Sequence, residues 1–491
     1  MSALIGTWPR RLLLAIAVTV VTALVMVFLA SGENSNVIGG GDVMKRMFIL
    51  AGLLGAAVFF LSTAFVGHAA KTAQPTEESS QHAAAPDPKK PFVAQVVGLE
   101  WLNPLQRRDY PTEWQILWAM GLVGPNKNDD MVRTKPARYG SLQSILAIAY
   151  GNEGEETFFG FYKKYIDQLL LLYANDYVLN QKYFYTVAAK DPAKWRELAG
   201  IHIEFAGPER LDPVYAKNWL SSDVASTFNI GNPAFKDLWT KSTPPDVHIT
   251  SGGPNAGFTS LNAALAYLQA NPDKSVWVMN WDAPSFPPKD AQLNENLVLL
   301  ILAGPEMKTE RAPLAWIGKA ATANVADYEP KAGTTRLNDA WKAAIATAAQ
   351  NANVPASKVN YVIHDAGKGS DAASSRIGAL GRTLTETLPE FDFHKQTFNM
   401  PALLGDTGAG TALTDVVLAI GRANHLGETV LVAGTTDAAH PVAVVVTPPE
   451  KVVPIDPNAD WFRARGENNA YLPWWGRRYD EKYDGEQGYS W

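Results

Sequence analysis

One arrangement of hydrophobic and polar positions occurs twice along this chain. Each copy has a glycine-rich turn, a run with hydrophobic residues at helical spacing, and two strand-like hydrophobic runs. In the first copy these segments are residues 251–257, 261–269, 276–279 and 297–302. In the second copy they are residues 405–410, 413–423, 430–432 and 442–446. Because order and spacing agree, the repeat predicts a body built from two similar halves.

Further strands and helices alternate around the two copies. The hydrophobic pattern predicts strands at 92–99, 247–250 and 359–363, and helices at 337–349 and 372–388. Residues 305–335 show no regular period and are expected to be irregular. Alternating strands and helices predict an α/β class with a layered fold and mainly parallel sheets.

The glycine-rich turns place a helix start in each half. A glycine is needed where the backbone takes a positive φ or approaches a neighbour closely, and a helix start directs several free N–H groups at one point. Two copies could therefore face one pocket. Asp282 and Asp437 follow the first strand of their copies, and this symmetry favours turn capping over catalysis.

The N-terminal residues have a different pattern. Residues 12–30 and 47–67 are each close to the roughly 20 apolar residues that cross a bilayer. They predict a membrane anchor at residues 1–70 with two transmembrane helices. Alternatively, translation starts at Met44, and the second run acts as a signal peptide or signal anchor. The two interpretations place the body on opposite sides of a membrane.

Composition divides the rest of the chain. Residues 71–91 are rich in Ala, Pro, Gln, Glu and Ser and are predicted to be a flexible linker. Residues 92–454 form the predicted α/β domain, with halves at approximately 92–335 and 336–454. Residues 455–491 form an aromatic-rich C-terminal tail.

Charge and residue usage exclude several classes of function. The net charge of −6 and the pI near 5.8 give no basic surface for a nucleic acid. The absence of cysteine excludes disulfides, thiolate metal sites and a cysteine nucleophile. The eight histidines show no pair at the sequence spacing of metal ligands, so neither a metal nor a cofactor is expected.

The second half carries a resemblance to the thiolase and ketoacyl synthase fold. The segment from Tyr361 to Gly367 resembles the strand that leads to that family's first catalytic histidine, and 404–410 resembles its second histidine loop. In the first half, Gly252, Gly253 and Asn255 lie where the family carries its nucleophilic cysteine.

The departures from this family bear on function. A condensing enzyme needs an activated thiolate and groups that stabilise an oxyanion. Here Asn255 and its neighbouring glycines replace the cysteine, and Asp406 replaces a histidine. We therefore predict a pseudoenzyme whose degenerate pocket contains Gly252, Gly253, Asn255, His364, Asp365 and Asp406. The alternative is an acyl- or lipid-processing enzyme at the membrane surface that uses His364, Asp365 and Asp406.

The C-terminal tail concentrates residue types that dominate protein interfaces. Either it lies over the domain surface or it binds a partner. The candidate partner-binding residues are Trp461, Trp474, Trp475, Arg477, Tyr479 and Trp491.

The chain as a whole resembles the adaptor proteins encoded beside lipase effectors of the type VI secretion system. This resemblance rests on the hydrophobic leader, the α/β body and the Trp-rich tail together. It implies a non-catalytic adaptor or chaperone that binds a phospholipase effector and recruits it to the secretion spike protein. It also implies an inner-membrane protein whose body faces the cytoplasm, with a periplasmic body as the alternative from Met44. The thiolase-like fold further suggests a homodimer.

Overall fold

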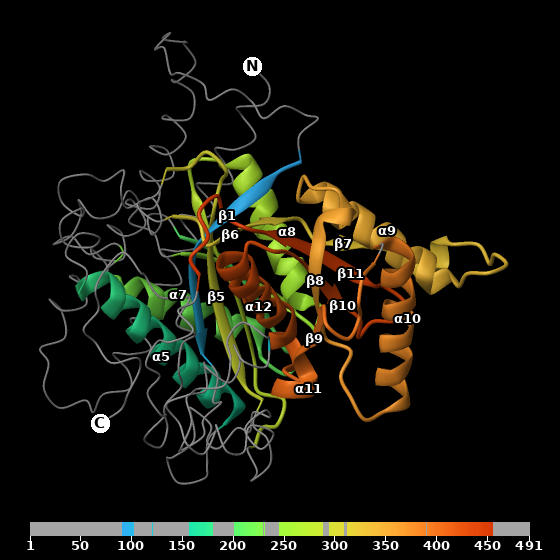
Figure 1. Cartoon of the computed structure of the whole chain (residues 1–491). Helices are drawn as coiled ribbons and strands as arrows, with labels where there is room; N and C mark the ends of the chain where they lie inside the picture. Colours follow the sequence, from blue (N-terminus) through green and yellow to red (C-terminus); the bar gives the residue numbers. More distant parts are fainter. Residues whose placement is uncertain are drawn as a thin grey trace, which may run out of the picture. The chain divides into compact units, whose positions relative to one another are not determined.

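A computed structural model describes most of the predicted α/β domain (Figure 1). The described residues are 91–102, 120, 157–179, 201–228, 230, 245–287, 294–308, 312–388 and 390–454. The chain divides into two compact units, residues 1–86 and 87–491, and every described residue belongs to the second unit.

One mixed β-sheet forms the centre of the described part of the chain. Its strands in the first half are β1 (Val93–Leu102), β2 (His202–Gly207), β3 (Asp246–Ser251), β4 (Ser275–Asp282) and β5 (Asn296–Ala303). Its strands in the second half are β6 (Ala315–Gly318), β7 (Ala321–Thr322), β8 (Val359–His364), β9 (Thr397–Asn399), β10 (Thr429–Gly434) and β11 (Val442–Thr447). The strand order is β3-β2-β4-β5-β1-β6-β11-β10-β8-β9, with β7 paired to β11.

The two halves have the same strand order. Reading from each outer edge, the first half runs β3-β2-β4-β5-β1, and the second runs β9-β8-β10-β11-β6. We number the strands of each half in chain order and set the short β7 aside. Both halves then run third, second, fourth, fifth and first from the outer edge of the sheet. Antiparallel pairing of β1 with β6 joins the halves. The predicted α/β class and the internal duplication are therefore confirmed.

The prediction of mainly parallel sheets is wrong. β2 pairs in parallel with β3 and β4, and β8 with β9 and β10. The remaining strand pairs, which involve β1, β5, β6 and β11, are antiparallel. β10 and β11 are separated only by residues 435–441, too few for a crossover connection, so β11 returns in the opposite direction, and β5 likewise pairs antiparallel with β4, the strand before it in the chain.

Helices cover both faces of the sheet. α8 (Ala256–Ala270) and α12 (Thr411–Leu426) contribute to one hydrophobic cluster with strands of both halves. α5 (Phe158–Leu179) and α7 (Pro213–Thr227) pack on the other face of the first half, while α9 (Arg336–Asn351) and α10 (Asp371–Thr387) do so in the second half. Figure 1 shows α5 and α7 on one side of α8 and α12, with α9 and α10 on the other. The remaining helix and 3-10 turns are α11 (Met400–Leu404), η4 (Val325–Asp327), η5 (Ala356–Lys358) and η6 (Gly408–Gly410).

The central strand β6 lies within the segment that was expected to be irregular. It has four residues, and a strand this short shows no alternation that can be separated from a loop. Tertiary pairing on both sides, with β1 and β11, makes it a strand. The prediction for 305–335 was therefore wrong at the point where the two halves join.

Glycine permits close contact between the central helices. A Cβ atom added at Gly257 in α8 would lie 2.9 Å from Cβ of Ala412 and 3.2 Å from Cγ of Leu413 in α12. Gly257 is buried and does not have a positive φ. It is therefore needed for close approach and not for turn geometry.

The membrane-protein prediction is corrected by the structure. No helix among the described residues is both long enough and apolar enough to cross a membrane. An inner-membrane protein with its body in the cytoplasm is therefore not supported. The predicted membrane spans at 12–30 and 47–67 lie outside the described residues. The predicted linker at 71–91 also lies outside them, except for its last residue.

Replacing Gly257 with alanine is expected to destabilise the protein, because a new methyl group would overlap Ala412. We expect a loss of about 1–3 kcal/mol in the free energy of unfolding, the usual range for overpacking. Urea denaturation of Gly257→Ala checks this value. The matched control is Gly253→Ala, since a Cβ there would meet no atom within 4 Å. Equal stability of the two variants would show that the helices do not approach as described.

Candidate functional site

The two central helices begin without a side-chain cap. Asn255 precedes α8 and Gly410 precedes α12, and neither supplies a side-chain hydrogen bond to its helix. In contrast, Asp212, Thr335 and Ser370 cap α7, α9 and α10 through side-chain oxygens. The structure thus leaves the starts of α8 and α12 without the caps that the peripheral helices have.

Asn255 lies against the second half. A Cβ added at Gly434, the last residue of β10, would lie 2.6 Å from Asn255 Oδ1 and 2.9 Å from Phe258 Cε2. Asn255 Oδ1 is buried, and it has no hydrogen-bond partner among the described residues. The side chain at the predicted nucleophile position is therefore a neutral amide held next to β10.

Asp365 is buried beside the same strand end. Its Oδ1 accepts hydrogen bonds from the backbone N–H and, at 2.7 Å, the hydroxyl of Thr435, and its Oδ2 accepts one from the hydroxyl of Thr436 at 3.0 Å. Burial raises the pKa of Asp365, although the bonds to Thr435 and Thr436 and the charge of Arg376 act in the opposite direction. Because Thr435 directly follows Gly434, Asp365 and Asn255 both adjoin the end of β10.

A second buried carboxyl group lies close to Asp365. Asp415, in α12, is fully buried, and both its oxygens lack a hydrogen-bond partner among the described residues. Burial and then the negative charge of Asp365 raise the pKa of Asp415 well above its usual range. Burial without a hydrogen-bond partner thus favours the neutral, protonated form of Asp415. Sequence reasoning missed this group because a single aspartate in a helix carries no motif.

His364 is directed to the opposite face of the sheet from Asp365. Its ring lies 5.9 Å from that of Phe393, which packs against the cluster formed with α9 and α10. Its Nδ1 accepts a hydrogen bond from the N–H of Ala366 at 3.3 Å. Burial lowers the pKa of His364 to about 4, so the ring is neutral at pH 7. Adjacent positions on a strand point to opposite faces, which is why His364 and Asp365 do not act on one point.

The second glycine-rich turn has positive-φ backbone geometry that the first lacks. Gly405 and Gly408 have φ values of 83° and 54°, whereas Gly252 and Gly253 do not have positive φ values. Asp406 is exposed between them, and its Oδ1 accepts a hydrogen bond from the N–H of Gly408 at 2.9 Å. The carboxylate therefore stabilises its own loop.

The two glycine-rich copies are bonded through Asp282. Its Oδ2 accepts a hydrogen bond from the N–H of Ala409 at 2.9 Å, and its Oδ1 accepts one from Ala283 at 2.7 Å. Burial raises its pKa, opposed first by the bond to Ala409. Asp437 instead caps its own turn through the N–H groups of Ala439 and His440. The predicted symmetry of these two aspartates holds only in part, because Asp282 reaches the other half.

The six residues predicted to line a degenerate pocket therefore have separate environments. Asn255 and Asp365 adjoin β10, His364 faces the α9 and α10 side, and Asp406 is in an exposed loop. Gly252 and Gly253 precede α8. The tail residues Trp461, Trp474, Trp475, Arg477, Tyr479 and Trp491 lie outside the described residues.

The arrangement is poorly suited to acyl transfer. The chain contains no cysteine, and the amide of Asn255 is not a nucleophile of the kind that forms acyl intermediates. Asp406 is exposed, and a carboxylate stabilises an oxyanion only when it is protonated. Asp365, Asp406 and Asp282 are instead hydrogen-bonded to neighbouring parts of the chain.

A family model matches most of the second half. Residues 319–448 match the model described as type VI lipase adapter protein Tla3, C-terminal. The matched segment includes α9, α10 and α12 and ends within one residue of the end of β11. The resemblance to type VI lipase adaptors is thereby confirmed for this part of the chain. A comparison with curated proteins gave no match.

Solved ketosynthase structures are also similar to the chain. One is the oxazolomycin ketosynthase domain OzmH KS8 from Streptomyces albus JA3453, with 14% identity and a TM-score of 0.42, covering 77% of this chain and 100% of that one. Another is the ketosynthase from module 6 of the bacillaene synthase from Bacillus subtilis 168, with 8% identity and a TM-score of 0.47, covering 73% and 72%. The strand order in the sheet, rather than these similarities, establishes the duplication.

Replacing Asn255 with alanine is expected to leave stability nearly unchanged, because its side chain neither caps α8 nor has a partner for its buried oxygen. We expect a change within about 0.5 kcal/mol, typical of sites without a specific interaction. Ser370→Ala is the comparison, since Ser370 Oγ accepts the N–H of Ala373 at 3.1 Å. Loss of that cap should cost about 1 kcal/mol. Denaturant unfolding measures both, and a larger loss for Asn255→Ala than for Ser370→Ala would contradict this role.

Proposed function

We propose that this protein is a non-catalytic adaptor that binds a phospholipase effector and recruits it to the spike protein of a type VI secretion system. The observation that carries the proposal is the match of residues 319–448 to the type VI lipase adapter model. That segment begins directly after β6 and includes all the later strands and helices of the second half.

The environment of the former catalytic positions supports a binding role. Asp365 is bonded to two threonines, Asp406 to its own loop, and Asp282 to the opposite half. Groups held in this way stabilise the fold, and the chain contains no cysteine that they could activate. A rigid scaffold that retains its core and has no activated nucleophile is suited to recognition of another protein.

We further propose that the tail, residues 455–491, contributes to the partner-binding surface, with Trp461, Trp474, Trp475, Arg477, Tyr479 and Trp491 as its anchors. Trp, Tyr and Arg combine a large contact area with hydrogen-bonding groups, and they are enriched among residues whose loss weakens complexes most. The body at 92–454 would then supply the folded platform, and it could also form a homodimer.

Removal of residues 461–491 is expected to weaken binding of the effector by at least about tenfold, because truncation of interface anchors commonly costs 1–2 kcal/mol or more. Co-purification of the chain with a type VI lipase effector, with and without a spike protein, provides the measurement. Asp406→Asn is the control, since it removes an exposed charge from the predicted pocket. It should bind as the unaltered chain does.

Activity assays on the same protein preparations distinguish the adaptor proposal from the enzyme alternative. Acyl-CoA and phospholipid turnover that is present in the unaltered chain and lost in Asp406→Asn would favour the acyl- or lipid-processing alternative. Unchanged effector binding after the truncation would exclude the tail from the binding surface. Failure of the unaltered chain to bind any lipase effector would contradict the proposal that the protein is an adaptor.

A further inference from the structure

Two adjacent parallel strands place four polar side chains on one face of the sheet. In the register of β2 and β3, His202 is paired with Asp246 and Glu204 with His248. Positions two apart on a strand share a face, so these four residues form a square. The square lies at the sheet edge, because β3 is the outermost strand of its half.

The intervening residues establish which face this is. Ile203 and Val247 belong to the hydrophobic cluster that includes α5 and α7 residues. The four polar side chains are therefore on the face that carries α8. Tyr267 of α8 confirms this, since its ring stacks on that of His202 with 3.9 Å between centroids and 6° between planes.

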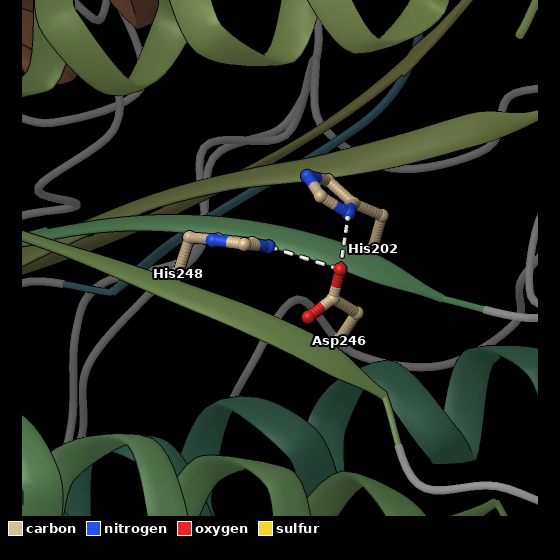
Figure 2. Close-up of side chains that lie close together, drawn as sticks. All are labelled: His202, Asp246 and His248. Carbon is tan, nitrogen blue, oxygen red and sulfur yellow. Dashed lines mark hydrogen bonds and ion pairs between the residues drawn. The ribbon is translucent and has the colours of Figure 1, made fainter. Parts of the chain in front are cut away.

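Three of the side chains converge on one point (Figure 2). Asp246 Oδ2 lies 3.2 Å from His202 Nδ1 and 2.9 Å from His248 Nε2. The three atoms all lie within 4.8 Å of one another. Ligand atoms around a tetrahedral Zn²⁺, at bond lengths of roughly 2.0–2.2 Å, are separated by about 3.3 Å. Small side-chain rotations would thus suffice to place all three atoms around one ion.

His202 has a supporting partner for its other nitrogen. His202 Nε2 lies 2.7 Å from Oε1 of the buried Glu204. A carboxylate in this position holds the proton on Nε2 and leaves the Nδ1 lone pair for a metal, which is a common arrangement at metal-binding histidines. Stacking on Tyr267 fixes the plane of the same ring.

Both nitrogens of His202 have a carboxylate neighbour. Nε2 faces Glu204 and Nδ1 faces Asp246. The two contacts are satisfied either by a ring that carries a proton on each nitrogen or by a cation at Nδ1 with the proton on Nε2. The geometry therefore accommodates a metal ion at Nδ1 while Nε2 donates to Glu204.

We propose that His202, Asp246 and His248 bind a divalent transition-metal ion, with Zn²⁺ as the ion that fits. Two imidazole nitrogens and one carboxylate oxygen suit Zn²⁺, whereas Mg²⁺ and Ca²⁺ take oxygen ligands. The Asp246 and His248 side chains are 64% and 50% exposed, so an ion can enter from solvent and water can complete its coordination. The site would tie the edge strand β3 to β2 through side chains as well as backbone bonds.

The test is zinc binding by the purified full chain after removal of metals with a chelator. The chain is dialysed against Zn²⁺, and bound zinc is measured by elemental analysis together with the thermal midpoint. His248→Ala should lose one zinc per chain, or bind it at least about tenfold more weakly, and it should lose the zinc-dependent rise in midpoint. Glu204→Gln should weaken binding by about 10–100-fold, as loss of such supporting partners does.

The matched control is His440→Ala. His440 is another exposed histidine paired with an aspartate, with its Nδ1 3.0 Å from Asp437 Oδ2 and a side chain 49% exposed. His440→Ala should bind as much zinc as the unaltered chain, because His440 is not part of the cluster of His202, Asp246 and His248. If His248→Ala is poorly folded, Asp246→Asn replaces it and should lose the same zinc. Retention of zinc by the altered chains, equal loss in His440→Ala, or no zinc in the unaltered chain would overturn the proposal.

Discussion

The contact between α8 and α12 is the constraint on which the rest of the structure depends. The two helices come from different halves, and both belong to the cluster that packs on strands of both. They approach closely because position 257 has no side chain where Ala412 and Leu413 meet it. A larger residue would push the helices apart and separate the sheet halves that they cover.

Polar bonds reinforce this apolar contact. Asp282 at the end of β4 accepts the N–H of Ala409, and the side-chain amide of Asn280 donates to the carbonyl of Gly410 at 2.8 Å. A buried carboxylate and a buried amide thus hold the second glycine-rich loop against the first half. Hydrogen bonds as well as apolar packing therefore join the two copies.

Sequence periodicity predicted the parts of the fold that depend on local patterning. The long helices α8, α9, α10 and α12 and the strands β4, β5, β8, β10 and β11 were anticipated, because each has enough residues for its period to appear. It failed for β6, which is a strand only because β1 and β11 pair with it. The antiparallel direction of β5 and β11 is likewise a matter of strand pairing, which composition does not report.

The sites show the same division between local and long-range information. The position of Asn255 at the start of a helix could be predicted from a motif, but the opposite orientations of His364 and Asp365 required the strand and its neighbours. The cluster of His202, Asp246 and His248 was not foreseen, because its two histidines are far apart in the sequence. Parallel register, which sequence spacing does not report, brings them together.

The central proposal is that this scaffold binds a type VI lipase effector. Isothermal titration calorimetry of the full chain with a purified type VI lipase effector tests that claim most directly. We expect a saturable heat with a fixed stoichiometry and a dissociation constant in the micromolar range or below, equivalent to roughly 8 kcal/mol or more of binding free energy. No measurable heat at micromolar concentrations of both proteins would contradict it.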